Sequence, residues 1–245
     1  MNDEPCRVPH SSFIIDKVNC RILKNILPYS FFLLSLPLMA QDSLRVTKNF
    51  HFTDGVYFSV SELQSNQPAH KWEDLDVWFF TNPQTYVTQV AHISNKADGQ
   101  HIDLAKVWAL SLDGIPYIRL PEGETRREMP TFAAVKLRGK ICYYAYPDWR
   151  VKKVRISAYN PLTGRPFRTG FVDREEEVFV EKMLHFESGE ITDFTTENLL
   201  RWIQDDPALV AIVKELPPGE KQEKLFKCLL IYVDRHEAFL KKKVR

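Results

Sequence analysis

Apolar and polar residues alternate along most of the chain from residue 43 to about residue 190, which is typical of half-buried β-strands. The pattern predicts strands over residues 43–48, 50–60, 75–80, 86–93, 102–112, 115–120, 132–146, 151–159 and 177–186. We expect the strand at 75–80 to be buried and the strand at 151–159 to be half-exposed or at an edge. The last run also fits a helix, and residues 61–66 predict a single helical turn.

Two Asp-Gly pairs, Asp54-Gly55 and Asp113-Gly114, stand between apolar runs. Asp-Gly is a strong signal for the tight turn of a β-hairpin, because both residues tolerate positive φ. The run at 132–146 is expected to bend at Arg138-Gly139-Lys140 into two strands. These turns favour an antiparallel meander over parallel βαβ units.

The hydrophobic period changes in the last fifty residues, where helices are expected. Thr195 or Thr196 can cap the first helix, and Asp206 followed by Pro207 is a helix start. Apolar residues of the third helix recur at i, i+3, i+4 and i+7, so this face is expected to pack on the chain's own sheet. The predicted helices cover residues 197–204, 207–215 and 220–243.

The sequence therefore predicts an α+β fold, with a mostly antiparallel β-sheet or barrel-like β region followed by a C-terminal helical subdomain. Residues 41–245 are expected to form this single domain. It should be β-rich over residues 41–190 and helical over residues 191–245.

The N-terminus predicts export. Residues 26–39 form an uncharged apolar run that follows Arg21 and Lys24 and ends at Ala40, the layout of a cleavable signal peptide. The run is shorter than the roughly 20 apolar residues of a spanning helix and contains two prolines, so no transmembrane span is expected in the mature chain. We expect residues 1–40 to be a signal peptide cleaved after Ala40 and the protein to be periplasmic or secreted.

The charges nearly cancel, with 33 Lys and Arg residues against 32 Asp and Glu residues. Nucleic-acid binding needs clustered positive charge that displaces counterions from phosphates, and therefore no nucleic-acid partner is expected. Hydrophobic residues make up 44% of the chain, which is ordinary for a globular domain with a substantial core.

Cys142 and Cys228 are the two cysteines beyond the expected signal peptide, one in an expected strand and one in an expected helix. An even pair in an oxidising compartment is a candidate disulfide, and the alternative is two independent buried thiols. The chain has no Cys-x-x-Cys, so the sequence supports neither a thioredoxin-like centre nor a cysteine zinc site.

No catalytic or cofactor motif is present: the chain lacks a Gly-x-Ser-x-Gly elbow, a phosphate-binding loop and GxGxxG. His236-Glu237 superficially fits a metalloprotease helix, but Leu240 occupies the place of the second ligand. The acidic run at 173–177 lacks the glycine and the alternating ligands of a calcium loop and is expected to be a solvated turn. We therefore expect no catalytic residue, no metal and no cofactor.

Aromatic residues cluster between residues 143 and 149, and Tyr144, Tyr146 and Trp149 form the candidate binding surface. Neighbouring strand residues point to opposite faces, so at least one of the tyrosines here is expected to be partly exposed. Exposed aromatic side chains can stack on sugars or anchor a protein partner. The alternative is that they are ordinary core residues of a sheet.

Residues 54–68 contain a DGxY turn, a short helical turn and then Asn-x-Pro. This segment resembles one found in uncharacterised exported proteins of Gram-negative bacteria, and the similarity continues loosely in residues 107–118. The resemblance implies an exported α+β domain without an assigned activity. It implies no catalytic residue.

The expected function is a non-enzymatic binding or structural module of the cell envelope, with an envelope protein or a glycan as partner. One alternative is an envelope hydrolase whose site forms only in the folded chain, and another is a carrier of a small apolar ligand. A hydrolase should bring together, in one pocket and with perturbed pKa values, two or more of His51, His70, Asp74, His92, His101 and Glu190.

The export prediction can be tested by mass spectrometry of the protein from its native cells. The expected mature N-terminus is Gln41. Because the stretch before the apolar run is long for a signal, we also expect translation to start near Val18. A tryptic peptide from residues 1–16 would contradict that start, and an intact residue 40–41 bond in the envelope form would contradict the cleavage.

Overall fold

The computed structural model describes residues 44–121, 129–217 and 221–241. These described residues belong to one compact unit. The expected signal peptide and the expected translation start near Val18 lie outside them. No helix of the described ranges is long and apolar enough to cross a membrane.

Short and long β-strands alternate with few helices through the first three quarters of the described chain. The strands are β1 Arg45–Val46, β2 Gly55–Tyr57, β3 His70–Lys71, β4 Leu75–Asn82, β5 Val87–Asn95, β6 Ala109–Leu112, β7 Ile115–Arg119, β8 Thr131–Leu137, β9 Ile141–Tyr159, β10 Pro166–His185, β11 Ile191–Asp193 and β12 Ala238–Phe239. The helices are α2 Val60–Gln64, α3 Thr196–Trp202, α4 Pro207–Lys214 and α5 Lys221–Arg235, with 3₁₀ turns at Trp72–Asp74 and Leu104–Lys106.

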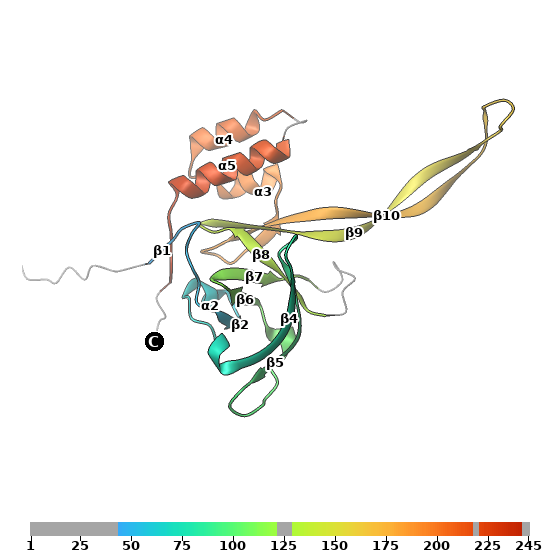
Figure 1. Cartoon of the computed structure of the whole chain (residues 1–245). Helices are drawn as coiled ribbons and strands as arrows, with labels where there is room; N and C mark the ends of the chain where they lie inside the picture. The colour runs from blue at the N-terminus through green and yellow to red at the C-terminus, as the bar shows by residue number, and fades with distance from the viewer. Residues whose placement is uncertain (1–43, 122–128, 218–220, 242–245) are drawn as a thin grey trace, which may run out of the picture. The chain divides into compact units, whose positions relative to one another are not determined.

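Ten of these strands form one antiparallel sheet (Figure 1). Its main path runs β11-β10-β9-β8-β7-β6-β2-β3, and β1 pairs separately with β12. The expected α+β class with a mostly antiparallel sheet and C-terminal helices is confirmed. The sheet is not closed into a barrel.

The sheet forks at β8. Residues 131–133 of β8 pair with β5, and Val135 and Leu137 pair with β9. Since β7 occupies the opposite edge of β8, β5 and β9 share one edge and follow each other along it. The β4–β5 hairpin and the β9–β10 hairpin therefore diverge from this point.

Both faces of the first half of β9 are buried, because side chains alternate across a strand. Cys142, Tyr144 and Tyr146 pack in one core cluster with residues of β1, β2 and α2. Ile141 and Tyr143 point the other way, into a cluster that the three C-terminal helices cover. The helical residues of that cluster are Leu199, Ile203, Leu209, Val213, Leu225, Cys228, Leu229, Tyr232 and Val233. The expected packing of the last helix on the sheet is thus confirmed.

The starts of α3 and α4 follow from their caps. The Thr195 hydroxyl accepts a hydrogen bond from the Asn198 N–H at 3.2 Å, and the Asp206 carboxylate accepts one from the Leu209 N–H at 3.0 Å. Each bond satisfies an amide that has no partner within its own helix. Pro207 occupies the first turn of α4, where its missing N–H costs nothing.

The prediction that the last helix reaches residue 243 is wrong, because α5 ends at Arg235. Ala238 and Phe239 instead pair with β1, and the Leu240 N–H donates to the Leu44 carbonyl at 2.9 Å. Backbone pairing with a distant strand overrides the helical spacing of apolar residues here.

Two predictions about the middle of the chain are also wrong. The acidic run at 173–177 is not a turn, because it lies within β10 and pairs with residues 149–153. The expected buried strand at 75–80 carries exposed Trp78, Phe79 and Phe80, since among the described strands β4 is an edge strand paired only with β5. The expected strands at 151–159 and 177–186 belong to much longer ones that begin at residues 141 and 166.

The two Asp-Gly pairs differ in outcome. Asp113 and Gly114 both have positive φ and close the β6–β7 hairpin as expected. Gly55 begins β2, which lies between β3 and β6, so Asp54 does not close a hairpin. The Asp54 carboxylate instead accepts hydrogen bonds from the Gly114 N–H at 2.8 Å and the Ser111 hydroxyl at 3.0 Å.

Gly55→Ala should destabilise the fold, because a Cβ there would lie 2.2 Å from the His70 carbonyl oxygen and 2.9 Å from the Pro68 Cβ. Forcing an atom into such a close approach costs about 1–3 kcal/mol. Gly170→Ala is the matched control, since nothing lies within 4 Å of its added Cβ. Urea denaturation of both variants measures the difference, and equal midpoints would contradict the close β2–β3 approach.

Candidate functional site

The second half of the β9–β10 hairpin pairs only with itself. We call residues 147–179, which include the loop that closes the hairpin, the arm. β8 reaches β9 no further than Tyr144, and β11 reaches β10 only at residues 182–184. Among the described residues the arm is therefore a two-stranded ribbon with both outer edges open (Figure 1).

Local sequence closes the arm at its tip. The Asn160 side chain accepts a hydrogen bond from the Leu162 N–H at 2.9 Å, and its backbone carbonyl accepts one from the Gly164 N–H at 2.8 Å. Gly164 has a φ of 63°, which glycine adopts without steric cost. The residues on either side then run back in register along the whole hairpin, with a single shift at Pro166–Arg168.

The arm exposes many large apolar side chains. Opposed residues of an antiparallel pair share a face, so Trp149, Phe171 and Phe179 lie on one face and Ile156 and Val172 on the other. Nine large apolar residues of the arm are between 46% and 94% exposed: Trp149, Val151, Ile156, Tyr159, Leu162, Phe167, Phe171, Val172 and Phe179. Neither face of the arm is covered by a core.

The charges of the arm are separated by strand. Residues 149–155 of β9, the basic segment, contain four bases and no acid, whereas residues 173–177 of β10, the acidic segment, contain four acids and Arg174. The two segments lie opposite each other, and Lys152 contacts Glu176 at 3.5 Å. Each exposed pair contributes little to stability, but one strand of the ribbon is basic and the other acidic.

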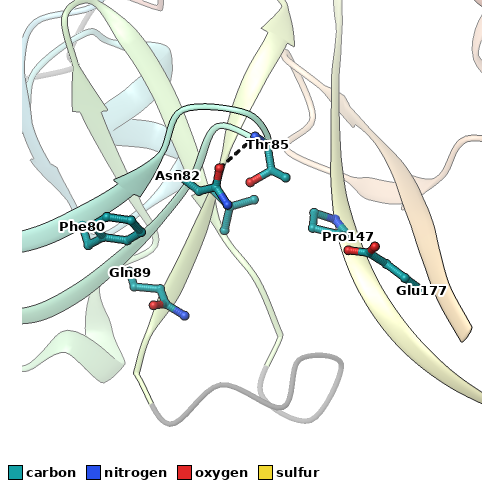
Figure 2. A pocket seen from close by; sticks show the side chains of 7 residues that line it. Phe80, Asn82, Thr85, Gln89, Pro147 and Glu177 are labelled. Atoms are coloured by element: carbon teal, nitrogen blue, oxygen red, sulfur yellow. Dashed lines mark hydrogen bonds between the residues drawn. The ribbon is translucent and has the colours of Figure 1, made fainter. Parts of the chain in front are cut away.

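A small open cleft of about 200 Å³ lies at the base of the arm, where the two hairpins diverge (Figure 2). The Asn82 side chain orders the β4–β5 turn beside it by accepting hydrogen bonds from the Gln84 and Thr85 N–H groups at 2.9 and 3.4 Å. The cleft is smaller than most small-molecule sites and has room for one side chain of a partner. Its lining is Phe80, Asn82, Thr85, Val87, Gln89, Pro147 and Glu177.

The structure does not bring the three residues of the candidate surface, Tyr144, Tyr146 and Trp149, together at the surface. Tyr144 and Tyr146 are core residues, 2% and 0% exposed, because the first half of β9 lies between two clusters. Trp149 is half-exposed, and it is the first aromatic residue of β9 beyond the core. Sequence reasoning predicted the half-exposed strand at 151–159 from apolar residues that alternate with charges, but it missed the partner strand over residues 166–176 and the exposed Phe171 on it.

The candidate disulfide is not formed. Cys142 and Cys228 are free thiols in different core clusters, on opposite faces of the sheet. Burial raises the pKa of the Cys142 thiol to about 11, as expected for an inert core cysteine. The alternative of two independent buried thiols describes this chain.

The described histidines lie at several separate places in the fold. The rings of His92 and His101 lie 4.5 Å apart, and His70 and His101 line a second open hollow of about 260 Å³. The Asp103 carboxylate in that hollow caps a 3₁₀ turn and pairs with Lys106 at 3.6 Å. Within residues 44–121, 129–217 and 221–241 no group of three or more possible ligands is placed to hold a metal ion.

The remaining members of the expected hydrolase set lie apart from that hollow. His51 packs against Gly114 in the β6–β7 turn, and Glu190 forms an ion pair with Arg201 at 2.7 Å. Asp74 ends the 3₁₀ turn before β4, where its carbonyl accepts a hydrogen bond from the Lys96 N–H at 2.9 Å. Of the expected set, the structure thus brings His70 and His101 to one hollow, with His92 against the His101 ring, and neither Asp74 nor Glu190 joins them.

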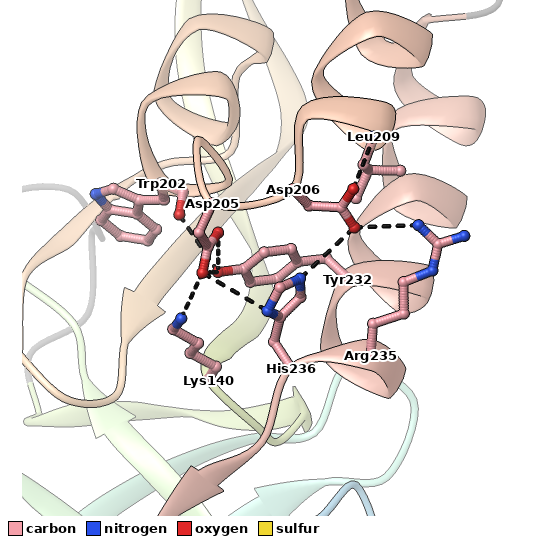
Figure 3. Close-up of polar contacts among 8 residues, drawn as sticks. All are labelled: Lys140, Trp202, Asp205, Asp206, Leu209, Tyr232, Arg235 and His236. Atoms are coloured by element: carbon pink, nitrogen blue, oxygen red, sulfur yellow. Dashed lines mark hydrogen bonds and ion pairs between the residues drawn. The ribbon is translucent and has the colours of Figure 1, made fainter.

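A polar network joins the helices to the sheet (Figure 3). The Asp205 carboxylate accepts hydrogen bonds from the Lys140 ammonium at 2.7 Å and from the Tyr232 hydroxyl at 2.9 Å. The His236 ring stacks on Tyr232 at 4.2 Å and lies between Asp205 and Asp206, 3.6 and 3.5 Å away. Since these groups pair with one another across three elements, we interpret the network as structural.

The pKa values in the network fit this interpretation. Desolvation raises the pKa of Asp205, but hydrogen bonds from Lys140 and Tyr232 outweigh it and hold the pKa below its ordinary value. Desolvation lowers the pKa of Lys140, but hydrogen bonds and charge interactions with Asp205 and Tyr232 together outweigh it, so the pKa is raised. Both shifts favour the charged pair.

Asp205→Asn should therefore lower the free energy of unfolding by about 1–2 kcal/mol at neutral pH, because Lys140 and Tyr232 lose a charged acceptor. A carboxyl whose folded pKa is depressed stabilises the fold above its unfolded pKa, near 3.8, and loses this contribution as pH falls through the folded pKa. Urea denaturation at neutral pH and at about pH 3 should thus show a difference that shrinks in acid. Asp234→Asn is the control, because Asp234 forms an exposed pair with Lys48 and its loss should change the free energy of unfolding by under about 0.5 kcal/mol. A loss of stability in Asp205→Asn that does not depend on pH would contradict the ion pair.

Comparison with known proteins gives no functional assignment for this chain. No family model, curated protein or solved structure matches the chain. The resemblance of residues 54–68 to exported Gram-negative proteins therefore stays a prediction.

Proposed function

We propose that this protein is an exported, non-enzymatic module of the cell envelope that binds another protein through the arm. The observation that carries the proposal is the set of apolar side chains on an uncovered two-stranded ribbon. The signal peptide expected from residues 1–40 supports the location.

An isolated two-stranded hairpin is marginally stable in water, and large exposed apolar surfaces mark interaction sites. Trp149, Phe171 and Phe179 are each more than half exposed on one face. Covering that exposed area, roughly 300 Å², would contribute on the order of 7 kcal/mol before the entropy cost of association. This gain is of the same order as the cost of association, about 4–15 kcal/mol, so the aromatic residues of the arm can offset much of that cost.

A protein fits the arm better than a glycan does. The open edges of β9 and β10 present backbone N–H and C=O groups that another strand can pair with. Sugars stack on single flat aromatic rings and leave such edges unpaired. The cleft at the base of the arm adds a place where one partner side chain can be held.

The binding proposal is tested by crosslinking the whole chain in intact envelope fractions and identifying what is captured. The triple variant W149A/F171A/F179A should lose a stoichiometric partner that the unchanged chain captures, because it removes the aromatic residues of one face of the arm. W78A is the matched control, since Trp78 is 71% exposed on β4, outside the arm.

Capture that persists in the triple variant, or that W78A abolishes equally, would contradict the arm as the binding surface. Circular dichroism and urea denaturation of the three proteins show whether the domain itself is unchanged. The substituted side chains are outside all three core clusters, so domain stability should be nearly the same.

A further inference from the structure

The two open edges of the arm differ in charge, and this difference restricts which strand can pair with each. Side chains of neighbouring strands that share a face lie about 5 Å apart, close enough for charges to attract or repel. A strand added beside the basic segment at residues 149–155 should be acidic. A strand added beside the acidic segment at residues 173–177 should be basic.

The arm itself contains both strands that its edges require. The acidic segment of one copy complements the open β9 edge of another copy, and the basic segment complements its open β10 edge. Each strand also brings an exposed apolar side chain to this region, since Val151 lies within the basic segment and Val172 directly precedes the acidic segment.

We propose that the arm pairs with the arm of a second copy of this chain, with β9 of one copy beside β10 of the next. This inference rests on the proposed function, since it takes the arm as the binding surface and names the partner. When both arms point in the same direction, the two strands are antiparallel. The basic and acidic segments then lie at the same height, because they already face each other within each hairpin.

Charge also determines the symmetry. A twofold dimer through the arm edges would place β9 beside β9 or β10 beside β10, and when the charged segments face each other, each arrangement brings like charges together. The pairing of unlike edges is heterologous, so each added copy leaves one basic and one acidic edge open. The expected product is a head-to-tail series of copies whose arms form one continuous sheet with alternating basic and acidic strands.

A charge-swapped arm tests this pairing while keeping the hairpin's own ion pairs. The charge-swapped variant has an acidic β9 segment and a basic β10 segment; its substitutions are R150E/K152E/K153E/R155E/D173K/E175K/E176K/E177K. Opposite charges still face each other within the hairpin, for example at positions 150 with 176 and 153 with 173. Copies of the swapped chain can still pair with each other. A swapped copy beside an unchanged copy would place acid beside acid and base beside base.

The experiment uses the whole chain, expressed with its own leader and purified in the form that the cells produce. Sedimentation velocity should show concentration-dependent association of the unchanged chain and of the swapped chain. In mixtures carrying two different tags, unlike copies should co-purify about tenfold less than like copies, because like charges at an interface are strongly penalised.

Three results would overturn the pairing: an unchanged chain that stays monomeric, unlike copies that co-purify as well as like copies, or a folded swapped chain that does not associate. The proposed binding function fails separately. If the unchanged chain is monomeric but captures an envelope protein that W149A/F171A/F179A does not capture, only self-pairing is wrong. If the aromatic variant changes neither capture nor association, the arm is not the binding surface.

Discussion

The burial of β9 on both faces is the constraint on which the rest of the domain depends. Tyr144 and Tyr146 are held in one core cluster and Ile141 and Tyr143 in the other, so the strand cannot slip by one residue without exchanging its two faces. This fixed register continues into the second half of β9, where no core exists to set it. The arm keeps this register because the first half of β9 is packed between two core clusters and the Asn160 turn closes the tip.

The fork at β8 explains why the arm has open edges. Because β5 and β9 follow each other along one edge of β8, the β4–β5 hairpin and the second half of the β9–β10 hairpin do not pair with each other. The Lys140–Asp205 pair fixes the helices over the first half of β9 only, so they do not cover the arm. Exposure of Trp149 and Phe179 thus follows from the topology of the sheet.

Local rules predicted what local interactions determine. The caps at Thr195 and Asp206 and the turn at Asp113-Gly114 each satisfy hydrogen bonds within a few residues, so their sequence signals were sufficient. The end of α5 was not predictable, because it depends on pairing with β1 across most of the chain. Tyr144 was misplaced for a similar reason: alternation shows that a strand has two faces, not how many of them are covered. The acidic run at 173–177 suggested a turn, since charges are rare in central strands, but a ribbon with water on both sides accepts them.

The separation of charge by strand has a consequence beyond the hairpin itself. Edge strands commonly carry charges that prevent pairing with arbitrary strands. If both strands of the arm were mixed in sign, that protection would be general, and no partner would be favoured by charge. With β9 basic and β10 acidic, the same residues that repel most strands attract those of the opposite pattern. Protection against aggregation and selection of a partner are then one property of the arm, and the exposed aromatic residues can be retained without unspecific association.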